Sequence, residues 1–158
     1  MFYNDGTRYV GNWVSGKKNG QGFEDWKSGN RYVGNFTDGS RSGEGTMLYN
    51  DGTFYRGTWK DAKRNGFGEE DFKSGNWYRG NHADDKRDGF GVMHYTDGTK
   101  YIGPWKAGEK EGLGWEDFKS GNIYVGQFTK NKRTGKGTMY YADGSKWTGQ
   151  WNDGSKVE

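Results

Sequence analysis

A period of 23 residues runs through this chain of 158 residues without an insertion or a deletion. Six copies follow one another from residue 9 to residue 146, each with Tyr-x-Gly at its start and Gly-x-Gly in its middle. A fixed period of this size is typical of a repeat architecture, in which one supersecondary unit cannot bury its apolar face without a neighbour. Because the surface repeats as well, we expect function to lie on rows of equivalent positions.

The units end in two alternating ways, which superimposes a period of 46 residues on the first. One kind ends in EDWKSGN or EDFKSGN, and the other ends in sequences such as MLYNDG and MYYADG. We predict one continuous array over residues 1–158. Its full repeats span residues 9–31, 32–54, 55–77, 78–100, 101–123 and 124–146, and partial repeats occupy residues 1–8 and 147–158.

Composition narrows the fold class. Apolar residues make up 29% of the chain, against roughly 45–50% in ordinary globular domains, so a conventional two-layer core is not expected. Aromatic residues reach 18%, which is far too high for a disordered chain of this hydrophilicity. The 30 glycines recur within every turn of any conceivable helix, which disfavours helix throughout. The chain has no cysteine, and hence no disulfide framework, and no apolar run of membrane-spanning length.

Two strand-like stretches in each unit predict an all-β fold of stacked antiparallel hairpins. In the first unit a six-residue loop at 14–19 would place Trp13 opposite Gly20, Gly11 opposite Gly22 and Tyr9 opposite Glu24. Opposed residues share a face of a sheet, so each aromatic side chain would lie over or beside a glycine. Glycine also permits strong bending, and we expect the sheet to curl about its aromatic face.

The pattern Tyr-x-Gly-x-Trp, a loop, Gly-x-Gly and a final Asp-Gly or Ser-Gly turn resembles the MORN repeat (membrane occupation and recognition nexus), over about the whole chain. The resemblance implies a single-layer antiparallel sheet in the form of an elongated, twisted rod. It also implies roles in scaffolding, in docking partner peptides or helices, and in binding anionic phospholipid. The implied location is cytoplasmic, with cytoskeletal, ciliary or membrane association.

Catalytic chemistry is not indicated by any motif. The Gly-x-Gly sites lack the following helix that a phosphate loop needs, and adjacent acids such as Glu24-Asp25 point to opposite faces of a strand. The two histidines, His82 and His94, are expected on opposite faces, which disfavours a shared metal site, and His82 is read as a packing residue in the position of Trp or Phe. We therefore predict no enzyme activity, no catalytic residue, no metal and no cofactor.

The aromatic face is the first candidate site. We predict a groove that docks a partner protein segment, helical or extended, with the helical form favoured because flexible methionines and acids suit an amphipathic helix. The groove would combine the first aromatic of each unit (Tyr9, Tyr32, Tyr55, Tyr78, Tyr101 and Tyr124), the second aromatic (Trp13, Phe36, Trp59, Trp105 and Phe128), and an alternating row of Glu24, Met47, Glu70, Met93, Glu116 and Met139.

A basic row is the second candidate site. One cation recurs at a single phase, which we expect on the exposed loop edge: Lys18, Arg41, Arg64, Arg87, Lys110 and Arg133. This row predicts the alternative function of binding anionic phospholipid or a membrane surface. Nucleic acid is the less favoured target of such a row. The net charge is only +3, so attraction to any anionic surface would be local and sensitive to salt. A third alternative is a non-catalytic regulatory arm of a larger enzyme.

Two further expectations follow from the same arrangement. Trp59 should span its own hairpin and the next, whereas Arg64→Ala on the loop edge should leave stability nearly unchanged. The unpaired strands at the two ends, near Tyr3 and at Lys146–Trp151, predict a homodimer formed by edge pairing.

Overall fold

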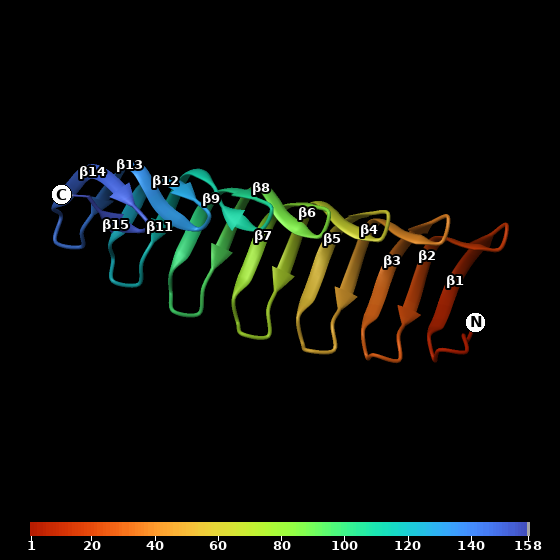
Figure 1. Ribbon diagram of the computed structural model, residues 1–158. Helices are drawn as coiled ribbons and strands as arrows, with labels where there is room; N and C mark the ends of the chain where they lie inside the picture. Colours follow the sequence, from red (N-terminus) through yellow and green to blue (C-terminus); the bar gives the residue numbers. More distant parts are fainter. Residues whose placement is uncertain (158) are drawn as a thin grey trace. The chain divides into compact units, whose positions relative to one another are not determined.

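The computed structural model describes residues 1–157, which form fifteen strands (Figure 1). No helix that could span a membrane occurs in these residues. The first strands of the hairpins are β1 (Arg8–Val14), β3 (Arg31–Thr37), β5 (Phe54–Lys60), β7 (Trp77–Ala83), β9 (Lys100–Lys106), β12 (Ile123–Thr129) and β14 (Lys146–Asn152). The returning strands are β2 (Lys17–Asp25), β4 (Ser40–Leu48), β6 (Lys63–Asp71), β8 (Lys86–His94), β10 (Glu109–Lys110) with β11 (Gly112–Asp117), β13 (Lys132–Tyr140) and β15 (Ser155–Lys156).

The strands form an open antiparallel sheet whose order follows the sequence, with the short β10 paired to β9 beside the main path. The chain comprises two structural units. The first contains Met1–Ser74 and His82–Asp85, and the second contains Gly75–Asn81 and the chain from Lys86 onward. The predicted all-β fold of antiparallel hairpin repeats is confirmed.

The hairpin turns differ from the prediction. Tyr9 pairs with Glu24 and Gly11 with Gly22, as expected, but Trp13 pairs with Lys18 and not with Gly20. The turn has two residues, Ser15 and Gly16, which both have positive φ (49° and 76°), the backbone that a tight hairpin requires. Of the remaining residues of the expected loop, Val14 extends β1 and residues 17–19 extend β2, where a bulge between Gly11 and Trp13 accommodates the extra residues. The six-residue loop was therefore wrong.

Ala62 offers a direct test of this turn geometry. It occupies the second turn position, where the first unit has Gly16, with a φ of 65°. A residue with a Cβ atom costs about 1–2 kcal/mol in the left-handed region. Replacing it with glycine removes this strain, but the greater entropy of glycine in the unfolded chain offsets part of the gain. We expect Ala62→Gly to raise the free energy of unfolding by about 0.5–1 kcal/mol in urea titrations. The matched change Ala83→Gly, at the last residue of β7 and outside the positive-φ region, should lower it, because it adds unfolded-state entropy without relieving strain; destabilisation by both would contradict the turn.

A tyrosine packed over a pair of glycines forms the core of each repeat. Tyr55 is 0% exposed and its ring covers Gly57 and Gly68, which face each other across β5 and β6. Its hydroxyl donates a hydrogen bond to the carbonyl oxygen of Thr58 at 3.1 Å, and the other five tyrosines of this row make the same bond to the residue three positions on. We call the face that carries these tyrosines the inner face.

Successive hairpins are joined on the inner face by rings that meet edge to face, an arrangement worth about 0.5–1.5 kcal/mol beyond the burial itself. Trp59 contacts Tyr55 of its own hairpin at 5.2 Å between centroids and Tyr32 of the preceding one at 5.4 Å. Its indole Nε1–H also donates to the carbonyl of Gly45 in that preceding hairpin. Trp59 therefore joins its hairpin to the one before it, and the expectation that it reaches the next hairpin was wrong in direction.

The opposite, outer face is a mixture of polar and apolar side chains exposed to solvent. Val33 and Phe67 are 52% and 58% exposed on the first unit, and Phe90 and Leu113 are 59% and 63% exposed on the second. Within residues 1–157, no other element forms a second layer over this face in either unit. The packed core of the fold is the inner face alone.

Candidate partner-binding face

The predicted basic row does not lie on a loop edge. Because the turns have two residues, Lys18 pairs with Trp13 and Arg41 with Phe36, so their side chains share the inner face with the aromatic rows. The side chain of Arg64 is only 17% exposed, and Lys110 is buried. The groove and the basic row, expected as two separate surfaces, therefore belong to one face.

Each cation of this row sits among aromatic rings. The guanidinium of Arg41 lies 4.8 Å from the ring centroid of Trp59, 5.5 Å from that of Trp26 and 5.8 Å from that of Tyr32. Contacts of this kind contribute about 0.5–2 kcal/mol, more as water is excluded. Equivalent three-ring cages hold Lys18 (Tyr3, Tyr9 and Phe36), Lys110 (Tyr95, Tyr101 and Phe128) and Arg133 (Phe118, Tyr124 and Trp151).

The glutamates of the alternating row neutralise every second cation. Lys110 Nζ donates to Glu116 Oε1 at 2.6 Å, and Lys18 pairs in the same way with Glu24. Within the first unit, Glu70 pairs with Arg64 and also lies 3.8 Å from Nε2 of the buried His82. Burial by itself would raise the pKa of the Glu70 carboxyl, but the interactions with the neighbouring His82 and with the charge of Arg64 outweigh burial and hold the pKa below its ordinary value. The carboxylate is therefore charged at neutral pH.

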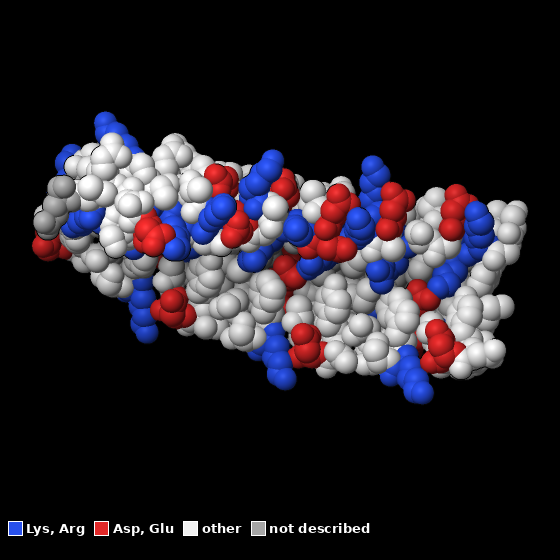
Figure 2. All heavy atoms as spheres, in the orientation of Figure 1, with Lys and Arg blue, Asp and Glu red and all other residues white. Residues whose placement is uncertain are grey.

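The edge formed by the two-residue turns is mixed in charge (Figure 2). Lys17 lies 3.7 Å from Asp38 in the next turn, and Lys63 lies 3.2 Å from Asp84. Exposed pairs of this kind contribute little to stability, but they interrupt any run of positive charge. The turn edge is thus not an unbroken cationic strip.

The predicted groove residues mostly form the floor of the inner face. All six tyrosines of the row are 0% exposed, while Phe36, Trp59, Trp105 and Phe128 are buried along with the alternating glutamates and methionines. Trp13, in the first hairpin, is the exception at 39% exposure. A partner can contact these residues only at their edges, so the accessible determinants must include other side chains.

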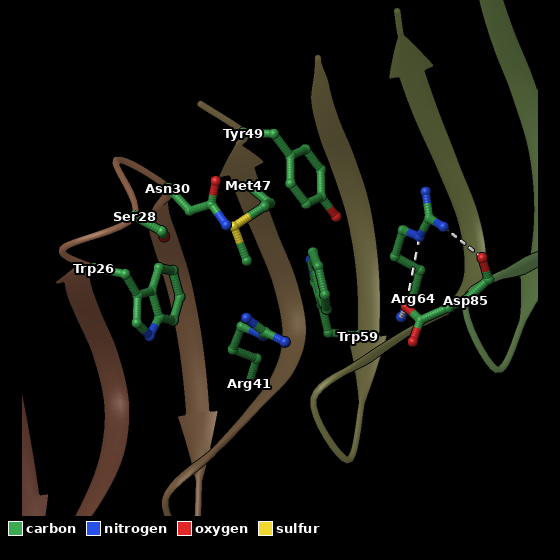
Figure 3. Close-up of a pocket in the computed structure, with 9 residues that line it drawn as sticks. All are labelled: Trp26, Ser28, Asn30, Arg41, Met47, Tyr49, Trp59, Arg64 and Asp85. Carbon is green, nitrogen blue, oxygen red and sulfur yellow. Dashed lines mark hydrogen bonds and ion pairs between the residues drawn. The ribbon is translucent and has the colours of Figure 1, made fainter. Parts of the chain in front are cut away.

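Those side chains are the aromatic residues that begin each five-residue link between hairpins, which we call the link aromatics. Trp26 and Tyr49 pack against the core of the first unit but remain partly exposed. With Arg41, Met47, Trp59 and Arg64 they line a pocket of about 410 Å³ (Figure 3). The sequence prediction missed this row, although it has the same 23-residue spacing as the others: Tyr3, Trp26, Tyr49, Phe72, Tyr95, Phe118 and Tyr141.

The histidines have packing roles on different faces. His82 takes the position of Trp59 in its own repeat, and its ring meets Tyr55 edge to face at 5.1 Å. His94 stacks on Trp77 at 3.8 Å. Residues 1–157 contain no cluster of three or more histidine or acidic side chains placed to hold a metal ion.

The buried tyrosines predict how the fold responds to alkali. Burial raises the pKa of Tyr32 and of Tyr124 to about 12, and it raises the pKa of Tyr55 and Tyr101 as well. Because the folded chain holds these protons more tightly than the unfolded chain, whose tyrosines titrate near 10, stability should fall as the pH rises from about 10 through about 12. Circular dichroism should lose its strand signal together with the appearance of tyrosinate absorbance. Tyrosinate formed near pH 10 with the strands intact would contradict this packing.

The fold and this face define a class: a β-hairpin repeat protein with one aromatic, partly charged surface repeated along the sheet. The MORN repeat family model matches residues 9–31, 32–54, 55–77, 78–100, 101–123 and 124–146. The chain belongs to the MORN repeat family, as its sequence pattern predicted.

Two solved structures are similar in fold. One is the TCP domain of Drosophila melanogaster SAS-4 in complex with a proline-rich motif of Ana2, with a TM-score of 0.58, 18% identity, and coverage of 93% of this chain and 79% of that one. The other is the TCP10c domain of Drosophila melanogaster Sas-4, with a TM-score of 0.52, 18% identity, and coverage of 93% and 88%. At this identity the likeness concerns the fold alone. A search of curated proteins gave no match.

Proposed function

We propose that this chain is a non-enzymatic scaffold that docks a linear segment of a partner protein along its inner face. The observation that carries the proposal is the pocket bounded by Trp26, Tyr49 and Arg41. Its walls are aromatic and apolar, and its polar groups include the cations Arg41 and Arg64 and the carboxylate of Asp85. Sites that combine apolar walls with a few polar groups are typical binding sites.

The solved TCP domain supports a protein partner. That domain has the same kind of sheet and was solved in complex with a proline-rich motif of a second protein. A proline-rich segment favours the extended polyproline II helix, which docks readily into aromatic-lined grooves.

Spacing favours such an extended segment over the helical one expected from the methionines. One hairpin advances the sheet by two strands, or roughly 9.6 Å. Three residues of polyproline II advance roughly 9.3 Å, whereas seven residues of an α-helix advance roughly 10.5 Å. Over three hairpins the mismatch is roughly 1 Å for polyproline II and roughly 3 Å for the helix, so only the extended segment stays in phase with the link aromatics.

A peptide-display selection tests the proposal. Peptides enriched on the wild-type chain should bind the inner-face variant Trp26→Ala/Tyr49→Ala at least tenfold more weakly. They should bind the outer-face variant Val33→Ala/Phe67→Ala, which removes two exposed apolar side chains, with unchanged affinity. The opposite ranking would contradict the proposal and move the docking surface to the outer face.

Binding to anionic lipid is the competing function, and sedimentation with vesicles containing an anionic phospholipid separates the two. The cations of the basic row are recessed among rings, and the turn edge is mixed in charge, so we expect little sedimentation at physiological salt. Strong sedimentation that falls steeply with added salt, together with failure of the peptide selection, would contradict peptide docking and support membrane binding as the function.

The proposed role fits a cytoplasmic, cytoskeleton-associated scaffold, as the family resemblance implies. Homodimerisation by edge pairing stays a prediction. At the N-terminal end, the backbone N–H of Tyr9 already donates to the carbonyl of Met1 at 2.9 Å, which occupies part of the edge of β1. We therefore expect any such dimer, detected by light scattering, to use the C-terminal end.

A further inference from the structure

Arg41 has hydrogen-bonding capacity that the folded chain does not use. One terminal nitrogen, Nη2, donates to the carbonyl oxygen of Ala62 at 2.7 Å. The buried Nε of the same guanidinium has no hydrogen-bond partner. Figure 3 shows the guanidinium between the rings of Trp26 and Trp59, at the pocket and beneath Met47. The Nε of Arg64 is in the same state, so what sets Arg41 apart is the lack of a carboxylate beside it. A carboxylate bound at the guanidinium of Arg41 would supply the charged acceptor that the chain itself does not offer.

The Glu/Met alternation explains why this arginine lacks a carboxylate. Lys18, Arg64 and Lys110 each pair with a glutamate six residues later in the sequence, on the same returning strand or its continuation. Six residues after Arg41 stands Met47, which is buried at 3% exposure and offers no negative charge. Among residues 1–157, no carboxylate oxygen forms an ion pair with Arg41, and the same holds for the two arginines of its kind, Arg87 and Arg133.

Arg87 and Arg133, in the second unit, make the same hydrogen bond from Nη2 and the same contact with an indole ring as Arg41. Each donates from Nη2 to a turn carbonyl of the following hairpin, Arg87 to Gly108 at 3.4 Å and Arg133 to Gly154 at 3.0 Å. Each also lies over an indole ring, at 4.5 and 4.8 Å from its centroid. The 46-residue period thus produces two classes of cation, one neutralised inside the chain and one left positive.

We propose that the arginines followed by methionine are carboxylate-binding sites, each of which receives an aspartate or glutamate side chain of the docked partner segment. This inference rests on the proposed docking function and specifies the chemistry of the partner. A guanidinium can bind a carboxylate through two parallel hydrogen bonds, and the flanking rings exclude water from that contact. The partner is an acidic extended segment rather than a lipid, because the guanidiniums are recessed beside the apolar walls and are not presented on the mixed-charge turn edge.

The spacing of the sites sets the spacing of the acids. Arg87 on β8 and Arg133 on β13 are four strands apart in the second unit, which corresponds to roughly 19 Å. Six residues of polyproline II advance roughly the same distance. The partner segment should therefore carry acidic residues six positions apart.

Two labelled peptides test this inference by fluorescence anisotropy. Both are twelve-residue proline peptides, one with glutamate at its third and ninth positions and one with glutamine there. We expect the glutamate peptide to bind the wild-type chain about tenfold to a hundredfold more tightly, the range for charge-assisted hydrogen bonds. The variant Met93→Glu/Met139→Glu places a glutamate six residues after Arg87 and after Arg133, as Glu116 follows Lys110. Each arginine then has a carboxylate partner within the chain, and the preference for the glutamate peptide should be abolished.

The control variant, Lys136→Gln/Lys146→Gln, removes two exposed outer-face cations and changes the net charge by the same two units. It should keep the full preference for glutamate. Equal binding of the two peptides to the wild-type chain would overturn the carboxylate sites and leave docking itself intact. A preference that survives Met93→Glu/Met139→Glu would also overturn them, and because the peptide comparison needs only the wild-type chain, it decides the matter even if that variant unfolds.

Discussion

Replacing Gly68 by alanine should cost about 3 kcal/mol of the free energy of unfolding, at the upper end of the usual range for overpacked cores. A Cβ atom on Gly68 would lie 2.3–2.5 Å from Oη, Cε2 and Cζ of Tyr55. That ring is 0% exposed and packs edge to face with Trp59, so it has no free space to move into. Urea unfolding monitored by tryptophan fluorescence gives the measurement.

Gly39→Ala is the matched control. Gly39 has a φ of +90°, and a Cβ there meets nothing within 4 Å, so the substitution brings backbone strain of about 1–2 kcal/mol without a clash. A second check is the double variant Tyr55→Ala/Gly68→Ala, in which removal of the ring should make the added methyl group nearly neutral. A cost for Gly68→Ala that is equal to that of Gly39→Ala would show that the tyrosine does not cover the glycine pair.

Arg64→Met should lower the free energy of unfolding by about 3–5 kcal/mol, because it leaves the carboxylate of Glu70 buried without its main partner. This reverses the expectation that Arg64 is neutral for stability, which assumed an exposed loop edge. Arg41→Met, with no carboxylate to leave behind, should cost only the lost packing and ring contacts, about 1–2 kcal/mol.

A compensating substitution and the pH dependence check the cause. Arg64→Met/Glu70→Met replaces the pair with the apolar chemistry of Met47 and should recover most of the loss. In Arg64→Met alone, burial without the neighbouring charge raises the pKa of Glu70, so the variant should regain stability relative to wild type as the pH falls and the carboxyl is protonated. A deficit that does not depend on pH would contradict a role for the buried charge.

The fold could be predicted from the sequence because its main determinants repeat at fixed phases. Tyr55 with Gly57, and the later Gly68, recur in six units, and only a hairpin places such residues on one face in register. Tyr9 opposite Glu24 and Gly11 opposite Gly22 were predicted correctly for that reason. The family followed from the same residues.

The position of the basic row could not be predicted, because a long loop and a short turn followed by a bulge use the same number of residues. The six residues at 14–19 are compatible with an open loop or with a two-residue turn followed by a bulge. The second solution requires positive φ at Ser15, a non-glycine residue, and two extra residues on β2 opposite Asn12. It moves Lys18 from solvent to the inner face.

The link aromatics were visible in the sequence, but their direction was not. Trp26 follows Asp25, the last residue of β2, where strand alternation no longer decides which way a side chain points. The link closes with Trp26 N–H donating to the carbonyl of Asn30 at 3.0 Å and Gly29 at a φ of 90°. This closed link holds the indole over Arg41, a contact that only the three-dimensional structure reveals.

Nuclear magnetic resonance of the tryptophan indoles tests the central claim most directly. Trp26, Trp59 and Trp105 belong to the inner face, and Trp77 and Trp115 to the outer face, so one spectrum reports on both. Titration with the tightest peptide from the display selection should shift the indole N–H signals of Trp26, Trp59 and Trp105 and leave those of Trp77 and Trp115 in place. Shifts confined to Trp77 and Trp115 would show that the partner docks on the outer face and would contradict the account.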